Sequence, residues 1–257
     1  SFVREDRVPA MKGSQELVRR MNEEQWALDA KRAGMNFAAL VPNHRGFDTF
    51  QNTAGDILDT VVVLTSCTDS HSKANVGLPL AEALDTSCGI IRNALAAGFR
   101  VVAFVSLAFG CPFEGAVDPK VVKDIVEAYN EQSVSRIVLA DTQGVGKPWQ
   151  VEELLGPEII CPSISRDKIG MHMHDTHRMA HVNIFAGMRA GIRHFDSATG
   201  GCGGCNFAPG ALGNIATQKL LRAIEEEHVV ESRDDAIRLH GMDHVALKKV
   251  QEYKEQN

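Results

Sequence analysis

No apolar run in this chain is long enough to cross a bilayer. Runs such as Val101 to Leu107 and Ile137 to Ala140 fall far short of the roughly 20 residues that a membrane helix needs. No charged-then-apolar leader opens the sequence either. The chain is therefore expected to be neither a membrane protein nor an exported one. The expected compartment is the cytoplasm if the protein is bacterial and the mitochondrial matrix if it is eukaryotic.

Basic residues and cysteines are also few. Lys and Arg total 27 against 33 for Asp and Glu, which gives a net charge of −6 and no basic block. This balance argues against a nucleic acid partner. Six cysteines are too few for a disulfide scaffold in 257 residues, and they indicate a reducing compartment. With 44% hydrophobic and 23% charged residues, the composition is typical of one large globular domain or two small ones.

Nucleotide-binding loops are absent as well. No predicted strand is followed by a glycine fingerprint of the kind found in dinucleotide-binding folds, and the sequence has no Gly-Lys-Ser/Thr phosphate loop. The chain instead alternates short β-branched runs with amphipathic helical patterns. The predicted strands are Asn36–Val41, Thr60–Thr65, Arg100–Ser106, Arg136–Asp141, Lys168–His174 and Ile192–Ser197. The clearest predicted helices are Leu78–Ala97, Pro119–Gln132, His177–Gly191 and Gly213–Glu226.

Continuously apolar strands separated by helices indicate a parallel sheet, either open and doubly wound or closed into a barrel. Polar or reactive residues follow several strands, an arrangement typical of the TIM barrel. These residues include Asn43, Ser66, Ser106, Asp141, His172, His174 and Asp196. Such a barrel has eight strands, and six are found. The fold class expected is therefore an incomplete α/β TIM (β/α)8-type barrel, with C-terminal helices in the charged segment from Glu225 to Asn257.

Two histidines stand two residues apart in the segment from Gly170 to Asp175. Side chains at that spacing share one face of a strand, so His172 and His174 can converge on one metal ion. The alternative is a pair of hydrogen-bonded barrel histidines without a ligand. Their place near the end of a buried strand favours the metal.

A glycine-rich loop runs from Gly200 to Gly213 and is typical of a mobile lid whose backbone approaches a ligand closely. Within it, Cys202 and Cys205 form a Cys-x-x-Cys pair, for which redox and zinc roles remain open. A single functional thiol on the lid is favoured. Asn214 follows the loop, either as an oxygen ligand for a hard cation or as the N-cap of the next helix.

Five segments, in order, resemble the 3-hydroxy-3-methylglutaryl-CoA lyases, the HMGL-like family. They are Pro42-Asn43 with Gly46-Phe47, the loop from Gly110 to Gly115, the segment from Asp141 to Gly146, the motif from His172 to Thr176, and the loop from Gly203 to Asn214. The glycine-flanked thiol is specific to these lyases, whereas the His-x-His and Asn are shared with related condensing synthases. The resemblance covers the whole chain but about six-eighths of the family's eight-stranded barrel.

The resemblance implies roles for individual residues. His172, His174 and Asn214 would be ligands of a divalent cation, Mg²⁺ or Mn²⁺, with His172 also part of the catalytic set. Cys205 would be the lid thiol that gives or takes a proton, and Asp141 an acid close to the substrate. Cys202 departs from the family pattern and receives no role. The resemblance further implies an acyl-CoA substrate and a homodimer or higher homo-oligomer.

The family's first strand ends in an Arg-Asp pair supported by a Glu, and none of these is found. Ser1-Phe2-Val3 resembles the end of the second strand, so residues 1–257 are expected to form a single HMGL-like, pyruvate carboxyltransferase-type catalytic domain that is truncated at its N-terminus. The strands at 36–41 and 192–197 would then have open edges. Two imidazoles and one amide are a weak set for a hard dication. Weak metal binding and negligible turnover are expected, unless the Arg4 to Arg7 segment supplies the missing groups.

The activity implied is cleavage of 3-hydroxy-3-methylglutaryl-CoA to acetyl-CoA and acetoacetate, as in leucine degradation. Three alternatives remain open. They are a lyase for a longer-chain 3-hydroxyglutaryl-CoA, a related acyl-CoA condensing synthase, and a catalytically impaired fragment that binds acyl-CoA or a full-length partner.

Overall fold

The computed structural model of the chain describes residues 1–160, 164–205 and 207–226. These residues fall into two compact units. Unit 1 comprises residues 1–106 and 118–138, and unit 2 comprises residues 107–117 and the described residues from 139 onward. The described part contains six strands, the number that the sequence predicts.

Unit 1 is built on three parallel strands in chain order. They are β1 (Phe37–Leu40), β2 (Leu58–Ser66) and β3 (Arg100–Ser106). β2 pairs with both neighbours, for instance through Val61 with Ala39 and with Val101. Val61 and Val101 are fully buried, as expected for strands that helices cover. The predicted bounds of β3 are confirmed.

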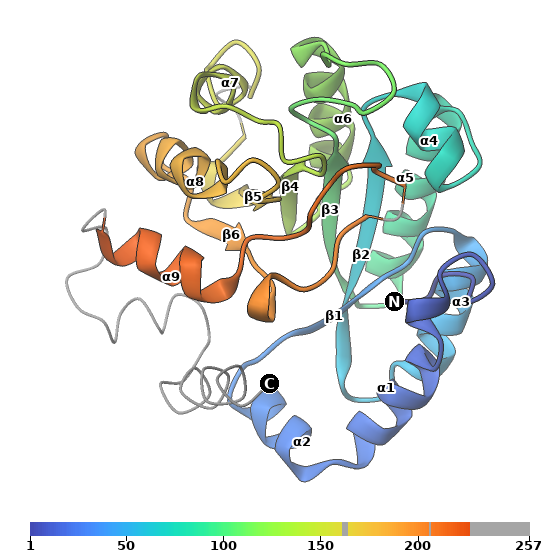
Figure 1. Ribbon diagram of the computed structural model, residues 1–257. Coiled ribbons are helices and arrows are strands. Elements are labelled where there is room, and N and C mark those ends of the chain that lie inside the picture. The colour runs from blue at the N-terminus through green and yellow to red at the C-terminus, as the bar shows by residue number, and fades with distance from the viewer. Residues whose placement is uncertain (161–163, 206, 227–257) are drawn as a thin grey trace. The chain divides into compact units, whose positions relative to one another are not determined.

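Helices both precede and follow the strands of unit 1 along the chain. They are α1 (Ser14–Glu23), α2 (Gln25–Arg32), α3 (His44–Thr53), α4 (Asp69–Asn75), α5 (Leu80–Ala96) and α6 (Pro119–Glu131), preceded by the 3-10 turn η1 (Pro9–Met11). α5 packs along β2 and β3 (Figure 1) and buries Ile90, Ile91 and Ala94 there. α6 begins where the Asp118 carboxylate accepts the Lys120 amide at 2.9 Å, a side-chain N-cap.

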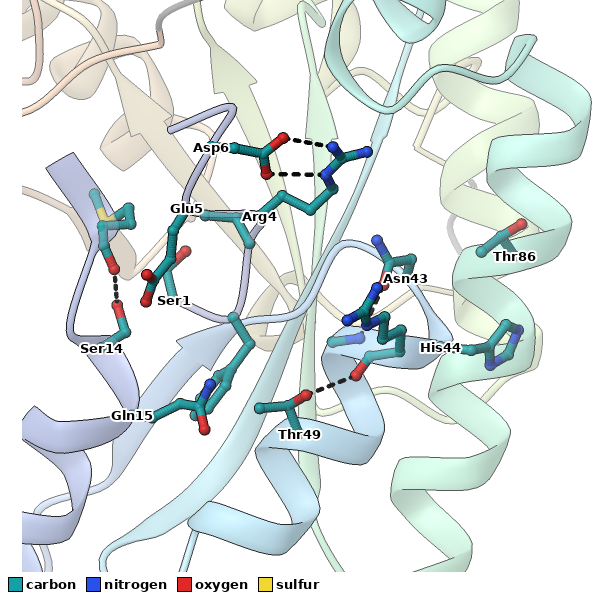
Figure 2. Close-up of a pocket in the computed structure, with 15 residues that line it drawn as sticks. Ser1, Arg4, Glu5, Asp6, Ser14, Gln15, Asn43, His44, Thr49 and Thr86 are labelled. Carbon is teal, nitrogen blue, oxygen red and sulfur yellow. Dashed lines mark hydrogen bonds and ion pairs between the residues drawn. The ribbon is translucent and has the colours of Figure 1, made fainter. Parts of the chain in front are cut away.

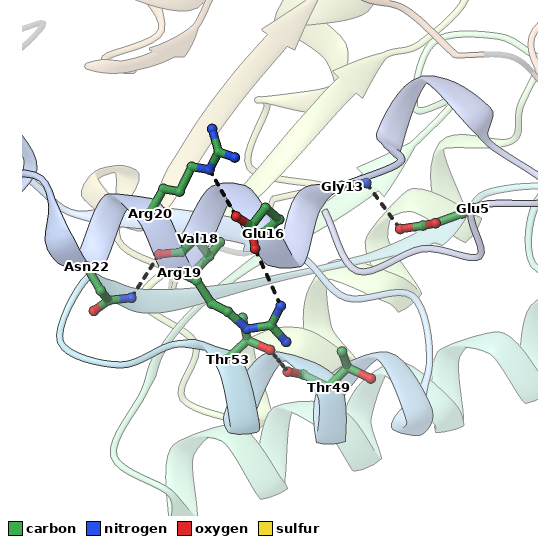
Figure 3. A network of polar contacts seen from close by, with 9 residues as sticks. All are labelled: Glu5, Gly13, Glu16, Val18, Arg19, Arg20, Asn22, Thr49 and Thr53. Carbon is green, nitrogen blue, oxygen red and sulfur yellow. Dashed lines mark hydrogen bonds and ion pairs between the residues drawn. The ribbon is translucent and has the colours of Figure 1, made fainter.

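One asparagine ties α1 to the turn between α3 and β2. The Asn22 Nδ2 donates to the Val18 carbonyl at 2.9 Å, and its Oδ1 accepts the Asp56 amide at 2.9 Å. Figure 3 shows this side chain beside the Glu16 to Arg20 ion pair of the same helix. Gly55 has a φ of +55°, and a Cβ there would meet the Asn22 side chain. The turn therefore requires glycine for both conformation and space.

The core of unit 1 contains a chain of buried hydroxyls. The Tyr129 hydroxyl donates to Thr65 Oγ1 at 2.7 Å, Thr65 donates to Ser87 Oγ at 3.3 Å, and Ser87 donates to the Leu64 carbonyl at 3.0 Å. Burial raises the pKa of Tyr129 well above its usual value, so the phenol stays protonated. Each donor has an acceptor, which is why these polar groups can be buried.

The last residue of β2 forms a second buried polar pair, in which Ser66 Oγ lies 2.7 Å from His71 Nδ1. His71 is fully buried, and burial lowers its pKa from 6.5. The unfolded chain therefore takes up a proton at His71 as the pH falls through 6.5, whereas the folded chain takes it up only at lower pH. This contribution to stability is present above that pH and is lost as the pH falls toward the folded pKa.

We expect urea unfolding to show this loss. The free energy of unfolding should fall between about pH 7.5 and about pH 5.5, with His71 contributing at most about 1.4 kcal/mol per pH unit. His71→Gln should flatten that slope, and His181→Gln, at an exposed position of α8 (Ala180–Arg189), should keep it. Equal slopes in wild type and His71→Gln would show that His71 is not the group involved.

Unit 2 carries the remaining elements. β4 (Arg136–Asp141) starts in unit 1 and ends in unit 2, and β5 (Ile169–Met173) pairs in parallel with β6 (His194–Asp196). The helices are α7 (Pro148–Leu154), α8 (Ala180–Arg189) and α9 (Thr217–Glu226), with 3-10 turns η2 (Arg166–Lys168) and η3 (Thr199–Gly201). α8 packs on β5 and contacts α7 and α9 (Figure 1).

Two helices begin later than predicted. α8 starts at Ala180 rather than His177, because Arg178 has a φ of +58° and cannot continue a right-handed helix. α9 starts at Thr217 rather than Gly213, because the residues before it pair with strand backbone. The prediction of C-terminal helices concerns residues beyond Glu226, which are outside the described residues. None of the described helices has the length and apolarity to span a membrane.

The open strand edges predicted from the sequence receive some cover within each unit. The Phe2 amide donates to the Leu40 carbonyl at 2.8 Å, so the first residues add a hydrogen bond beside β1. Just after β6, the Ala198 amide donates to Ile215 and its carbonyl accepts the Thr217 amide. Backbone groups near both strands are therefore partly satisfied.

Candidate active site

Strand β5 and the residue that follows it present two histidines, His172 and His174, on one face. Met171 and Met173 are each 1% exposed, and a Cβ on Gly187 of α8 would meet the Met171 sulfur. The methionines therefore face the helix, and the alternate residues face the other way. The His172 and His174 rings lie with centroids 5.3 Å apart at an interplanar angle of 57°. This is the proximity that the sequence spacing predicts.

His174 is the more buried of the two imidazoles. Its side chain is buried, and its Nδ1 has no hydrogen-bond partner. Burial, with a smaller contribution from the charge of His172, lowers the pKa of His174 to about 4. The ring is therefore neutral near pH 7, which is the form that binds a metal ion.

Asn214 lies beside His174 through an antiparallel backbone bridge. The neighbouring Ile215 amide donates to the Met173 carbonyl at 3.0 Å, and the Asp175 amide donates to Gly213 at 2.9 Å. Asn214 Nδ2 donates to the Cys202 carbonyl at 2.9 Å, while its Oδ1 is buried without a partner. The N-cap alternative is wrong, because the helix starts at Thr217. The amide instead joins the glycine-rich loop to the histidines.

Asp141 closes the loop that follows β4. Its two carboxylate oxygens accept the Val145 amide at 3.0 Å and the Gly146 amide at 2.9 Å, and its carbonyl accepts the His174 amide at 3.3 Å. Burial raises its pKa to about 6, against the opposing effect of these amides. A Cβ on Gly146 would come within 2.8 Å of the carboxylate, so this close turn requires glycine. The carboxyl group of Asp141 thus organises the loop, and its backbone carbonyl holds the residue that follows β5.

The glycine-rich loop is anchored by side chains from the neighbouring loops. Gln143 Nε2 donates to the Pro209 carbonyl at 2.8 Å, and the Leu212 amide donates to Thr176 Oγ1 at 3.2 Å. Beyond the loop, Lys219 of α9 pairs with Asp175 at 2.7 Å. These contacts fix the chain on the C-terminal side of the two cysteines.

The two loop cysteines differ in exposure. Cys205 is half-buried, whereas Cys202 is exposed. Burial raises the pKa of the Cys205 thiol, opposed by the amides of Phe207 and Ala208. Cys205 is therefore held in the protonated form near neutral pH. Cys67 and Cys88 are buried, as expected, whereas Cys161 lies outside the described residues.

The donor atoms near β5 fit a divalent cation in part. Among the described residues, no three His, Cys, Asp or Glu side chains gather as a metal-binding group, which leaves no thiolate zinc cluster there. The candidate set is two imidazoles and the amide oxygen of Asn214. Two of its atoms, His174 Nδ1 and Asn214 Oδ1, are buried without partners, as expected of ligand atoms. The set is neutral, so a hard cation would gain from a further carboxylate.

Sequence reasoning missed one residue beside the histidines. Asp196 stood among the polar residues at strand ends but received no role. The β5 to β6 register places it next to His172, with Oδ2 at 3.3 Å from Nδ1. In the predicted strands 168–174 and 192–197, His172 and Asp196 are each the fifth residue, an equal offset from the strand start that would have pointed to this pair.

Unit 1 has a pocket of its own, of about 810 Å³. Figure 2 shows it between the N-terminal segment, the start of α3 and Thr86 of α5. Arg4 and Asp6 at its rim form an ion pair with each other, Nε to Oδ1 at 3.1 Å. Asn43, from a motif that carries the resemblance, caps α3 by accepting the Gly46 amide at 2.8 Å. Within the Arg4 to Arg7 segment, the charges of Arg4 and Asp6 are therefore paired with each other.

Comparison with known proteins identifies the class of fold. The solved HMG-CoA lyase from Acinetobacter baumannii, in complex with coenzyme A and 3-methylmalate, is similar with a TM-score of 0.79 and 28% identity, over 93% of this chain and 74% of that one. The predicted class, an incomplete α/β barrel of the TIM type, is confirmed.

The family follows from the sequence. A family model described as HMGL-like matches residues 9–252. The hydroxymethylglutaryl-CoA lyase of Pseudomonas mevalonii is 34% identical over 221 residues, which is 86% of this chain and 69% of that protein. The (R)-citramalyl-CoA lyase of Chloroflexus aurantiacus is 36% identical over 223 residues, with the same two shares. The chain belongs to the HMGL-like family of lyases, whose members generally depend on a divalent metal ion.

Proposed function

We propose that this protein is a divalent-metal-dependent carbon-carbon lyase that cleaves 3-hydroxy-3-methylglutaryl-CoA to acetyl-CoA and acetoacetate, with residues 1–257 acting as one catalytic domain. The observation that carries the proposal is the group formed by His172, His174 and Asn214. Two of its ligand atoms are buried without partners, and it is hydrogen-bonded to the loop of Cys205. Similarity to the P. mevalonii lyase supports the substrate.

In this proposal, His172, His174 and Asn214 hold Mg²⁺ or Mn²⁺. A cation bound there would act as a Lewis acid toward the hydroxyl of the substrate. His174 contributes a neutral ring because burial lowers its pKa. Asn214 directs its oxygen toward the site because its nitrogen is bound to the Cys202 carbonyl.

The remaining chemistry is assigned to the chain's own side chains. A base accepts the hydroxyl proton, the bond between C2 and C3 breaks as the ketone of acetoacetate forms, and the electron pair of that bond passes to the acetyl thioester as an enolate. Cys205 then donates a proton from Sγ to C2, a role that suits a thiol kept protonated by burial. The loop excludes water from the enolate. Asp141 positions this site by holding the loop after β4 and the backbone of His174.

A second substrate has specific support, because the C. aurantiacus relative acts on (R)-citramalyl-CoA and is similarly close in sequence. In that thioester the carbinol carbon carries its carboxylate directly, whereas a methylene intervenes in 3-hydroxy-3-methylglutaryl-CoA. The two substrates therefore place their carboxylates at different distances from the same hydroxyl. Longer-chain 3-hydroxyglutaryl-CoA substrates differ at the remaining substituent. The cleavage rate on each of these thioesters decides which one is the substrate.

The test is a substrate panel. The 257-residue chain and an extended chain, joined to a family-like strand-helix-strand segment that carries the Arg-Asp pair, are incubated with each thioester and Mg²⁺. The extension supplies the carboxylate that a neutral donor set lacks. We expect the extended chain to have its highest kcat/KM for 3-hydroxy-3-methylglutaryl-CoA. A higher value for citramalyl-CoA, or net condensation instead of cleavage, would assign one of the rivals.

A further inference from the structure

We propose that Asp196 is a positioning residue that fixes the tautomer of His172. Its carboxylate accepts the Nδ1–H of the imidazole and thereby directs the lone pair of Nε2 toward the cation. This inference rests on the proposed function only in taking His172 as a metal ligand.

The strand register is the first support. β5 and β6 pair in parallel with Gly170 opposite His194, Met171 opposite Phe195 and His172 opposite Asp196. Directly opposed residues on neighbouring strands have side chains on the same face of the sheet. Asp196 is therefore held beside His172 by backbone pairing and not by a flexible loop.

Packing on the other face gives the same assignment. A Cβ on Gly187 of α8 would lie 3.3 Å from a ring carbon of Phe195 and would also meet the Met171 sulfur. Met171 and Phe195 therefore both face α8. Since alternate residues of a strand point to opposite faces, His172 and Asp196 face away from that helix together.

The contact itself determines which nitrogen carries the proton. His172 Nδ1 lies 3.3 Å from Asp196 Oδ2. An ionised carboxylate only accepts hydrogen bonds, and a neutral imidazole has one N–H and one lone pair. The N–H must therefore be on Nδ1, which leaves the lone pair on Nε2. Metal-binding histidines commonly hold their other nitrogen in this way, and the carboxylate orients the ring and increases its basicity.

The neighbouring ring lacks such support. His174 Nδ1 is buried and has no partner. The two imidazoles are thus unequal: an aspartate orients His172, whereas burial and the backbone bridge to Asn214 hold His174. Loss of Asp196 should therefore affect His172 selectively.

The first experiment reads the tautomer in the metal-free, full 257-residue chain labelled with ¹⁵N-histidine. Spectra are recorded where the imidazoles are neutral, and the His172 signals are assigned with His172→Gln. We expect the Nδ1–H tautomer of His172 in the wild type, a mixture in Asp196→Ala, and recovery of the Nδ1–H form in Asp196→Glu. A purely structural role of Asp196 would not produce this tautomer exchange.

The second experiment measures Mn²⁺ binding by electron paramagnetic resonance. Asp196→Ala should bind Mn²⁺ about 10- to 100-fold more weakly than wild type. Asp196→Asn should lose less than Asp196→Ala, because its amide oxygen can still accept the Nδ1–H. Glu152→Gln, which removes one exposed negative charge on α7, should match wild type and so controls for a general charge effect.

The outcomes separate the inference from the proposed function. A wild-type chain with His172 in the Nε2–H form overturns the inference, and this reading does not depend on the folding of any Asp196 variant. Unchanged Mn²⁺ affinity in Asp196→Ala also overturns it. A wild-type chain with the Nδ1–H tautomer but no Mn²⁺ binding supports the role of Asp196 toward the ring and contradicts the metal-dependent function.

Discussion

Replacing Cys205 by serine is expected to lower the turnover of the extended chain by about 10²- to 10⁴-fold, the contribution of a positioned proton donor. The Cys205 thiol is half-buried, and burial raises its pKa, so it is protonated at neutral pH. A hydroxyl in its place is a far weaker acid and cannot protonate the enolate at a comparable rate. The release of acetyl-CoA, followed as kcat, measures the effect.

Cys202→Ser is the matched control for this experiment. It removes the exposed thiol of the same loop and leaves the loop backbone unchanged, so its kcat should stay close to wild type. Alkylation by a bulky thiol reagent should abolish cleavage in Cys202→Ser, through Cys205. Full activity in Cys205→Ser would remove the thiol from the mechanism.

Replacing His174 by alanine is expected to abolish metal-dependent cleavage. The change deletes a buried nitrogen of the proposed metal site, beside Asn214. Loss of a residue that only supports a ligand lowers metal affinity by about 10- to 100-fold. Loss of a proposed ligand itself should lower the Mn²⁺ affinity further. A Mn²⁺ titration of the extended chain, with kcat measured in parallel, gives both quantities.

His181→Ala serves as the control for His174→Ala, since this imidazole is exposed on α8. Both its Mn²⁺ affinity and its turnover should equal those of the wild type. Circular dichroism of the variants shows whether the fold is retained. A folded His174→Ala variant with wild-type Mn²⁺ affinity would contradict the assignment of the metal site.

The strands could be predicted because their signal is local. β3 and β4 were predicted with their observed bounds, since Arg100–Ser106 and Arg136–Asp141 are continuous apolar runs ended by polar residues. β6 was predicted too long, because its pairing with β5 covers three residues and the chain then turns into η3. Such an end is set by the partner strand. It cannot be found from the segment's own composition.

The candidate site was only partly predictable for the same reason. Strand periodicity placed His172 and His174 on one face, as Met171 against α8 bears out. The half-burial of Cys205 depends on loop anchors such as Gln143 and Thr176, which are distant in sequence. The partner of His172 depends on the β5 to β6 register. Contacts of this kind arise from tertiary pairing, which no local pattern encodes.

The most direct test of the account is product analysis of 3-hydroxy-3-methylglutaryl-CoA incubated with the extended chain. The account predicts equal amounts of acetyl-CoA and acetoacetate, loss of both after EDTA treatment, and their return with Mg²⁺ or Mn²⁺ but not in His174→Ala. Cleavage that is unaffected by EDTA and by His174→Ala, or no cleavage of any acyl-CoA by a folded extended chain that binds Mn²⁺, would contradict it.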